Sequence, residues 1–132
     1  MGKLTFTAFD LGGHDQARRV WNQYFPAVDS VVFVVDAADR KVMSKVVYEL
    51  DKLLNDEQIS HCPILVLGNK KDRLDAMGED ELRYSLGLHG RTTGKDKVPR
   101  ETLMTRPIEL FMASVVRGEG YGEGFRWLAQ YL

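Results

Sequence analysis

The chain has 132 residues, 44% of them hydrophobic and 28% charged, which is the composition of one globular domain with a substantial core. The net charge of −1 favours neither a nucleic-acid partner nor an anionic lipid surface. The single cysteine, Cys62, cannot form an internal disulfide, and no apolar run approaches the roughly 18 residues that a membrane span requires.

The first part of the chain predicts a strand, a helix and a second strand. Residues 3–10 alternate, with Leu4, Phe6 and Ala8 on one side, which predicts a half-buried strand. Residues 17–25 predict a short helix that Pro26 ends. Residues 30–36 are almost continuously apolar, as in a strand of a parallel sheet that is covered on both faces.

The middle of the chain continues the alternation. Asp39 is predicted to cap a helix whose apolar residues recur at three- and four-residue spacing from Val42 to Leu54. Residues 63–69 form a second buried strand. Residues 79–86 predict a helix that ends at Gly87, a glycine suited to the position after the C-cap.

The last part begins with the longest candidate loop, the polar segment at 89–106. Residues 108–113 predict a further apolar strand. Residues 124–132 predict a helix with an apolar stripe made of Phe125, Leu128, Ala129 and Leu132.

Strands that alternate with helices predict an α/β fold, a three-layer, mostly parallel sheet with helices on both faces. Ligands of such sheets bind at the carboxyl ends of the strands. Asp10, Asp36, Asn69 and Ser114 all lie at or just past a predicted strand end. We therefore expect these polar residues to converge on one edge of the sheet.

The string D-L-G-G-H at 10–14 has the parts of a γ-phosphate sensor. Asp10 offers a carboxylate to Mg²⁺, Gly13 offers an amide to phosphate, and His14 can orient a water molecule. Taken alone, the string is better explained by a turn with glycine at positive φ.

The string N-K-K-D at 69–72 has the parts that recognise guanine. Asn69 is an amide, the stem of Lys70 can lie over the ring, and Asp72 can accept hydrogen bonds from the N–H groups of the base. A simple Asn/Asp turn is the alternative. Both strings together, in this order and at strand ends, favour a nucleotide site.

The string at 90–96, G-R-T-T-G-K-D, superficially resembles a phosphate-binding loop. It has one residue too few between the glycines, and Asp96 replaces the Ser or Thr that would hold Mg²⁺. We interpret it as a surface loop, and His61 and His89 as surface residues without metal-ligand spacing.

Residues 10–29, D-L-G-G-H-D-Q-A-R-R-V-W-N-Q-Y-F-P-A-V-D, resemble the Sar-type small GTPases of the COPII coat. Relatives of the Arf branch share D-x-G-G but usually carry Gln at the position of His14. The likeness continues through 35–39, 63–73, 92–95 and 120–132, and so covers essentially the whole chain.

The resemblance implies a role for each site residue. Asp10 would face Mg²⁺ through water, the Gly13 amide would sense the γ-phosphate of GTP, and His14 would orient the attacking water. Guanine would be bound by Asn69, Lys70 and Asp72, and the base oxygen by the backbone of Ser114, Val115 and Val116. Ala113 stands where the family often has cysteine, a change expected to be neutral.

The resemblance also implies the biology of a GTP/GDP switch in vesicle budding from endoplasmic reticulum to Golgi. The implied partners are the inner COPII coat subunits, including the GTPase-activating one, and an exchange factor of the endoplasmic reticulum membrane. The implied localisation is cytoplasmic and peripheral, at the membranes of the endoplasmic reticulum and Golgi.

The sequence departs from the family at its beginning, because no G-x-x-x-x-G-K-[ST] loop occurs in it. The expectation is a single partial GTPase domain over 1–132, without the phosphate loop, the first switch and the amphipathic helix that binds membrane. A fragment, a misassigned start and a natural truncation all remain open. The alternatives are a non-catalytic interaction module and an Arf-branch GTPase, and we expect the chain to form a homodimer or a rearranged sheet.

Overall fold

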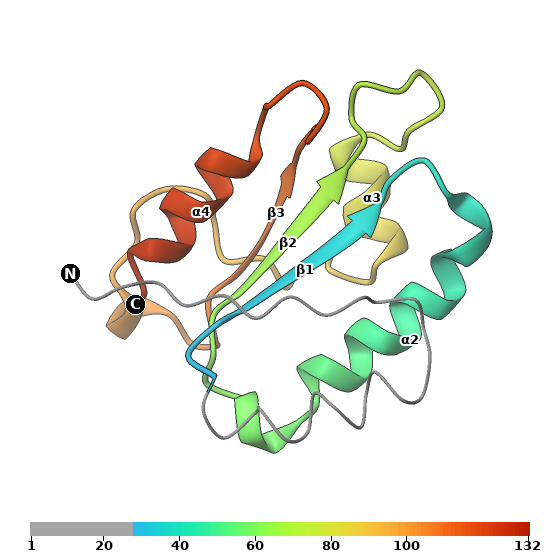
Figure 1. Ribbon diagram of the computed structural model, residues 1–132. Helices are drawn as coiled ribbons and strands as arrows, with labels where there is room; N and C mark the ends of the chain where they lie inside the picture. Colours follow the sequence, from blue (N-terminus) through green and yellow to red (C-terminus); the bar gives the residue numbers. More distant parts are fainter. Residues whose placement is uncertain (1–27) are drawn as a thin grey trace.

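The computed structural model describes residues 28–132, and Figure 1 shows a central sheet between two layers of helices. The described elements are three strands and three α-helices, with short 3₁₀ turns between them. The strand predicted at 3–10 and the helix predicted at 17–25 lie outside the described residues. The α/β class and the parallel, three-layer arrangement predicted from the sequence are confirmed for the described part.

The sheet has the order β1-β2-β3, and both pairings are parallel. Its strands are β1 (Val31–Asp36), β2 (Ile64–Asn69) and β3 (Ile108–Met112). In register, Asp36 lies opposite Asn69, and Gly68 lies opposite Met112. All three strands therefore end at one edge of the sheet, and each agrees with its predicted segment to within one residue.

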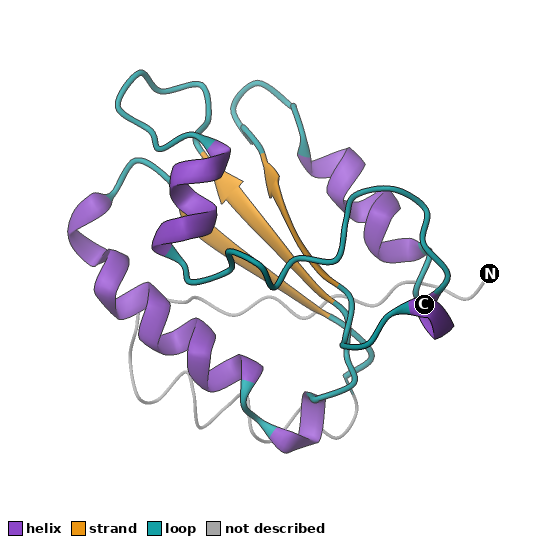
Figure 2. Ribbon diagram, turned by 180° about the vertical axis from the view of Figure 1, so that it is seen from behind, coloured by secondary structure: helices purple, strands orange, loops and turns teal. Residues whose placement is uncertain are grey.

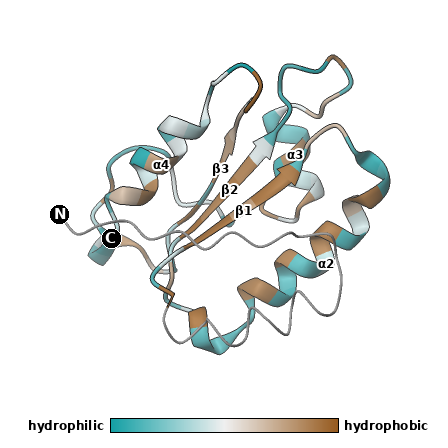
Figure 3. Ribbon diagram, viewed as in Figure 1, coloured by the Kyte–Doolittle hydropathy of each residue, from teal (hydrophilic) through white to brown (hydrophobic). Residues whose placement is uncertain are grey.

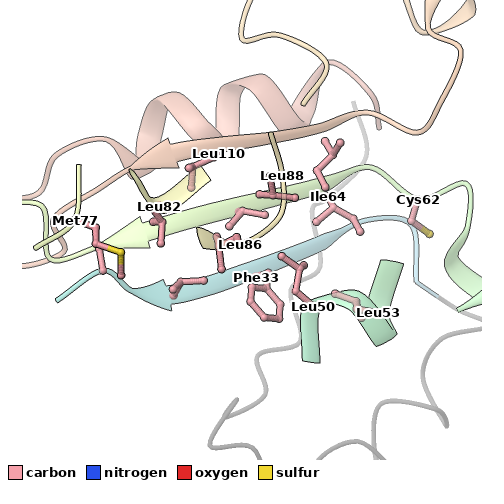
Figure 4. Packing of buried hydrophobic residues seen from close by; sticks show 14 of the residues in the cluster. Phe33, Leu50, Leu53, Cys62, Ile64, Met77, Leu82, Leu86, Leu88 and Leu110 are labelled. Atoms are coloured by element: carbon pink, nitrogen blue, oxygen red, sulfur yellow. The ribbon is translucent and has the colours of Figure 1, made fainter. Parts of the chain in front are cut away.

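One face of the sheet is covered by α2 (Met43–Leu54) and α3 (Glu79–Ser85). Figure 4 shows Phe33 of β1 close to Leu50 and Leu53 of α2, whereas Leu82 lies over β2. Cys62 belongs to the same cluster, fully buried just before β2, and its thiol donates to the carbonyl oxygen of Val28 at 3.3 Å. It is a small core residue.

The other face is covered by α4 (Tyr121–Ala129). Trp127 and Leu128 pack on Leu65 and Leu67 of β2 and on Phe111 of β3. Figure 3 shows the strands as strongly hydrophobic ribbons. Cover on both faces explains the continuous burial of β2 and β3, whereas β1 is less buried and its Val34 is 48% exposed.

The start of α2 differs from the prediction. Asp39 makes no capping hydrogen bond with its side chain, and a 3₁₀ turn at Arg40–Val42 precedes α2, whose N-cap is Val42. Asp36 takes the turn-forming role instead, because its Oδ1 accepts from the Ala38 amide at 2.9 Å. The predicted cap was therefore wrong, although the helix and its apolar face are confirmed.

The end of α3 is as predicted. Gly87 has a φ of +73°, and its amide donates to the Tyr84 carbonyl at 3.0 Å. The Leu88 amide donates to the Arg83 carbonyl at 2.9 Å, which completes a Schellman motif. The polar segment that follows carries one 3₁₀ turn, Arg100–Thr102, and is otherwise a loop.

The last helix is displaced from its predicted bounds. It begins three residues earlier, at Tyr121, and ends at Ala129, so Leu132 lies beyond it and is 50% exposed. The predicted stripe was wrong at Leu132 and omitted Trp127, which is only 4% exposed. Among the described helices, none has the length and apolarity to cross a membrane.

Candidate functional site

Three loops meet at the edge where the strands end, and Figure 2 shows them together from behind. Backbone hydrogen bonds join the loop after β1 to the end of β2, and the loop after β2 to the end of β3. The Ala37 amide donates to the Asn69 carbonyl at 3.0 Å, and the Lys71 amide donates to the Ala113 carbonyl at 3.0 Å. The predicted convergence of Asp36, Asn69 and Ser114 on one edge therefore exists in the structure.

Asn69, the last residue of β2, holds two loops together with one oxygen. Its Oδ1 accepts from the Lys70 amide at 2.8 Å and from the Val115 amide at 3.1 Å. Its Nδ2 makes no hydrogen bond within residues 28–132, so two donors remain for a ligand. An asparagine in this position both builds the edge and presents a polar group to solvent.

Lys70 has the backbone conformation of a functional turn. Its φ of +73° is the one positive φ of a non-glycine residue in the described chain. Its Nζ lies 2.7 Å from Oδ2 of Asp36, so this ion pair joins the loop after β2 to the end of β1. Burial raises the pKa of the Asp36 carboxyl, but the hydrogen bonds from Lys70 and the Ala38 amide outweigh it and hold the pKa below its usual value.

Asp72 is held from the third strand. The Ser114 hydroxyl donates to Oδ1 of Asp72 at 2.7 Å, and Ser114 is fully buried. This hydrogen bond lowers the pKa of the Asp72 carboxyl, and the charges of Arg117 and Arg73 lower it further. The carboxylate is thus ionised at neutral pH, and its Oδ2 has no hydrogen bond to the described residues.

The loop after β3 is closed by a two-residue bridge. The Ser114 amide donates to the Glu119 carbonyl at 2.9 Å, and the Glu119 amide donates back at 3.0 Å. Gly120 follows with a φ of +83°, and a Cβ there would lie 2.1 Å from the Met112 carbonyl oxygen. Only glycine allows the chain to pass this close to β3.

The tip of this loop carries exposed apolar side chains. Val115 is 65% exposed and Val116 is 88% exposed. The amides of Ser114 and Val115 already donate to Glu119 and Asn69, whereas the Val116 amide has no acceptor among the described residues. Of the three backbone donors predicted to meet the base oxygen, Val116 is the one left available.

Asp10, Gly13 and His14, predicted for Mg²⁺, the γ-phosphate and the attacking water, lie outside the described residues. Within residues 28–132, no group of three or more His, Cys, Asp or Glu side chains could hold a metal ion. Sequence reasoning missed the Lys70–Asp36 ion pair and the Ser114–Glu119 bridge. The signal for the bridge was the G-E-G string at 118–120, which is typical of a tight turn.

The phosphate-loop-like string at 90–96 lies at the start of β3, away from this edge. The Thr93 amide donates to the Ile108 carbonyl at 2.8 Å, and the Gly94 amide donates to Oε1 of Glu109 at 2.9 Å. The Gly94 carbonyl accepts from Nε1 of Trp127 at 2.8 Å. These backbone groups bind the protein itself and form no phosphate cradle, which confirms the interpretation as a loop.

Comparison with known proteins gives one consistent result. The model of the ADP-ribosylation factor family matches residues 1–132. "Small COPII coat GTPase SAR1" of Nicotiana tabacum is 42% identical over the whole chain, which covers 69% of that protein. The protein of the same name from Giardia intestinalis is 39% identical over the whole chain, which covers 69% of that protein. "ADP-ribosylation factor K" of Dictyostelium discoideum is 33% identical over 98% of this chain, which covers 62% of that protein.

The fold described above, a parallel sheet between two layers of helices, agrees with this family. The family match and the two relatives extend the agreement over the whole chain. This chain therefore belongs to the ADP-ribosylation factor family of small GTPases, in its Sar/Arf branch.

Proposed function

We propose that the chain carries the guanine-binding part of a Sar-type GTP/GDP switch, as one partial GTPase domain over 1–132. The observation that carries the proposal is the edge at which Asn69, Asp72 and Ser114 are locked together by hydrogen bonds of 2.7–3.1 Å. The preorganised Asn69 amide can donate to an acceptor of guanine, and the preorganised Asp72 carboxylate can accept from its N–H donors.

Each residue has a distinct part in this proposal. Nδ2 of Asn69 donates to a ring nitrogen of the base, and Oδ2 of Asp72 accepts from its N–H groups. The stem of Lys70, fixed at its end by Asp36 2.7 Å away, lies along the ring. The Val116 amide donates to the base oxygen.

The chemistry of hydrolysis is proposed on the family resemblance. Gly13 would bind the γ-phosphate, His14 would orient the attacking water, and Asp10 would reach Mg²⁺ through a water molecule. When bound, Mg²⁺ neutralises charge on the phosphates.

The cellular role follows from the two relatives that are named small COPII coat GTPases. We place the protein at the cytoplasmic face of the endoplasmic reticulum, in traffic toward the Golgi. Its partners there would be the inner coat subunits, including the GTPase-activating one, and a membrane exchange factor. Membrane contact would need an amphipathic helix of the kind that precedes the G domain in the family.

A second function is favoured by one specific observation. The 132 residues contain no G-x-x-x-x-G-K-[ST] string. In proteins that have this string, it makes charge-assisted hydrogen bonds to the phosphates, each worth about 1.5–3 kcal/mol. In this form the chain would bind GTP and GDP weakly and act as a non-catalytic interaction module. An Arf-branch GTPase is disfavoured by His14.

The nucleotide proposal is tested by competition between GDP and ADP for the purified protein. We expect GDP to bind at least tenfold more tightly than ADP, because Asp72 pairs with N–H groups that adenine lacks. Asp72→Ala should abolish the preference. Asp75→Ala is the matched control, because it removes an exposed carboxylate of the same loop that pairs with Arg73 instead.

The catalytic proposal is tested in a form of the protein that contains a phosphate loop. His14→Ala should slow GTP hydrolysis about 10²-fold while GTP binding stays nearly unchanged, because the side chain acts by positioning water. Hydrolysis at the parental rate would remove His14 from the mechanism. GTP-dependent capture of the inner coat subunits by the same protein tests the cellular role.

A further inference from the structure

A pocket of about 420 Å³ lies at the opposite end of the sheet from the nucleotide edge. Its walls are the end of α2, the turn before β2, the first residue of β3 and the 89–106 loop. This volume lies within the range of small-molecule sites in proteins. Nothing in the proposed nucleotide function uses it.

Among the described residues, the lining of the pocket carries positive charge and no counter-charge. Arg91 and Arg106 both line it, and none of the lining residues within 28–132 is Asp or Glu. Neither guanidinium makes an ion pair within residues 28–132. Two like charges share one concave site, an arrangement that costs free energy unless an anion occupies it.

Arg106 is the better buried of the two. Its Nη2 donates to the Leu54 carbonyl at 2.9 Å, whereas its buried Nη1 has no partner among the described residues. Burial lowers the pKa of the Arg106 guanidinium, and the charge of Arg91 lowers it further. A buried donor without an acceptor is uncommon in folded proteins.

Hydroxyl groups complete the lining. Those of Ser60, Thr92 and Thr105 make no hydrogen bond within residues 28–132, so they remain available to a ligand. The wall itself is fixed, because Thr93 bonds to both backbone groups of Ile108 and Trp127 holds the Gly94 carbonyl. The site is therefore formed in advance of binding.

We propose that this pocket binds the phosphate group of a small phosphate monoester. Two guanidinium groups carry the charge that balances a phosphate dianion, and their planar forks suit its oxygens. The hydroxyls donate to the remaining oxygens. Because the pocket is larger than a phosphate ion, it has room for the organic part of the ligand.

The proposal is tested by amide NMR titration of the full chain at constant ionic strength. The probes are inorganic phosphate, glycerol 3-phosphate and, separately, vesicles of phosphatidylcholine with phosphatidic acid. We expect saturable shifts of the Gly90, Thr92 and Thr105 amides with the soluble probes, and at least tenfold weaker binding of glycerol 3-phosphate by Arg91→Gln and by Arg106→Gln. Arg91→Gln is the safer variant, because Arg91 is exposed and makes no structural bond.

Two control variants separate this site from other sources of binding. Lys97→Gln removes an exposed cation of the same loop that does not line the pocket, and Asp72→Ala disables the nucleotide edge. Both should bind glycerol 3-phosphate as the parent does. Vesicle binding that depends on Arg91 and Arg106, with no response to the soluble probes, would identify a lipid headgroup as the source. No localised shift with any probe, or equal loss in Lys97→Gln, would overturn the proposal.

Discussion

Oγ of Ser114 and Oδ1 of Asp72 lie 2.7 Å apart, and their hydrogen bond joins the loop after β3 to the loop after β2. Ser114 is fully buried, whereas the carboxylate of Asp72 reaches solvent. The buried residue thus fixes the direction of the exposed one. A binding carboxylate that is oriented before the ligand arrives loses little conformational entropy on binding.

Ser114→Ala should weaken guanine binding without touching the ligand itself. The hydroxyl also accepts from the amide of the exposed residue Arg117 at 3.1 Å, so its removal loses a second hydrogen bond, worth about 0.5–1.5 kcal/mol. We expect a lower free energy of unfolding in urea and a pKa of Asp72 that returns toward its ordinary value. An unchanged pKa of Asp72 in carboxyl NMR would contradict the positioning role.

Gly120→Ala should be among the most damaging single substitutions. The new Cβ would lie 2.1 Å from the Met112 carbonyl oxygen, at a φ of +83°. Together, overlap and strain should cost about 3 kcal/mol or more in the free energy of unfolding. Gly122→Ala is the matched control, because Gly122 lies in the first turn of α4 and a Cβ there would meet nothing closer than the Arg126 guanidinium at 3.5 Å. Equal stability of the two variants in urea would contradict this reading of the loop.

The Asp36–Lys70 ion pair should make stability depend on pH in the acid range. The pKa of Asp36 is lowered from its ordinary value of 3.8, so its contribution is present above that pH and is lost as the pH falls through the folded-state pKa. Solvent reduces the effect, because the Asp36 side chain is 35% exposed.

The measurement for this pair is the urea midpoint of the parent and of Asp36→Asn between pH 6 and about pH 2. The parent should be more stable at pH 6, and the difference should shrink below pH 3.8. Asp51→Asn controls for the loss of one carboxylate, because the Asp51 side chain is exposed and makes no ion pair in the described residues. A difference between parent and Asp36→Asn that stays constant with pH would exclude the ion pair as its source.

The 132-residue polypeptide should form a dimer at micromolar concentration. Within the described residues β1 pairs only with β2, so one edge of β1 has no strand beside it, and Val34 is 48% exposed. An open edge with apolar side chains favours pairing with another strand, supplied by a second copy or by residues 4–9. We expect light scattering to give twice the 15.0 kDa of one chain, and Val34→Lys to weaken the association. A folded monomer whose β1 amides exchange freely along that edge would exclude both kinds of pairing.

Sequence patterns predicted the three described strands to within one residue, because long apolar runs between turn residues have few other solutions. They also predicted that Asp36, Asn69 and Ser114 lie at one edge, because the carboxyl ends of parallel strands meet there. The cap at Asp39 was wrong because Asp36, three residues earlier, competes for the same turn. The Lys70–Asp36 ion pair could not be predicted, because it depends on the path of the loop after β2, whereas the G-E-G string at 118–120 indicated a turn near the Ser114–Glu119 bridge but not its partner.

The most direct test of the account is to locate a guanine nucleotide on the protein by amide NMR. With saturating GDP, the shifts should concentrate at residues 69–72 and 114–117, the Val116 amide should move most among 114–116, and ADP should leave these residues unchanged. Asp72→Ala should remove the GDP shifts, while Asp75→Ala should keep them. Shifts of equal size with GDP and ADP, or GDP shifts confined to other parts of the chain, would contradict the assignment of this edge to guanine.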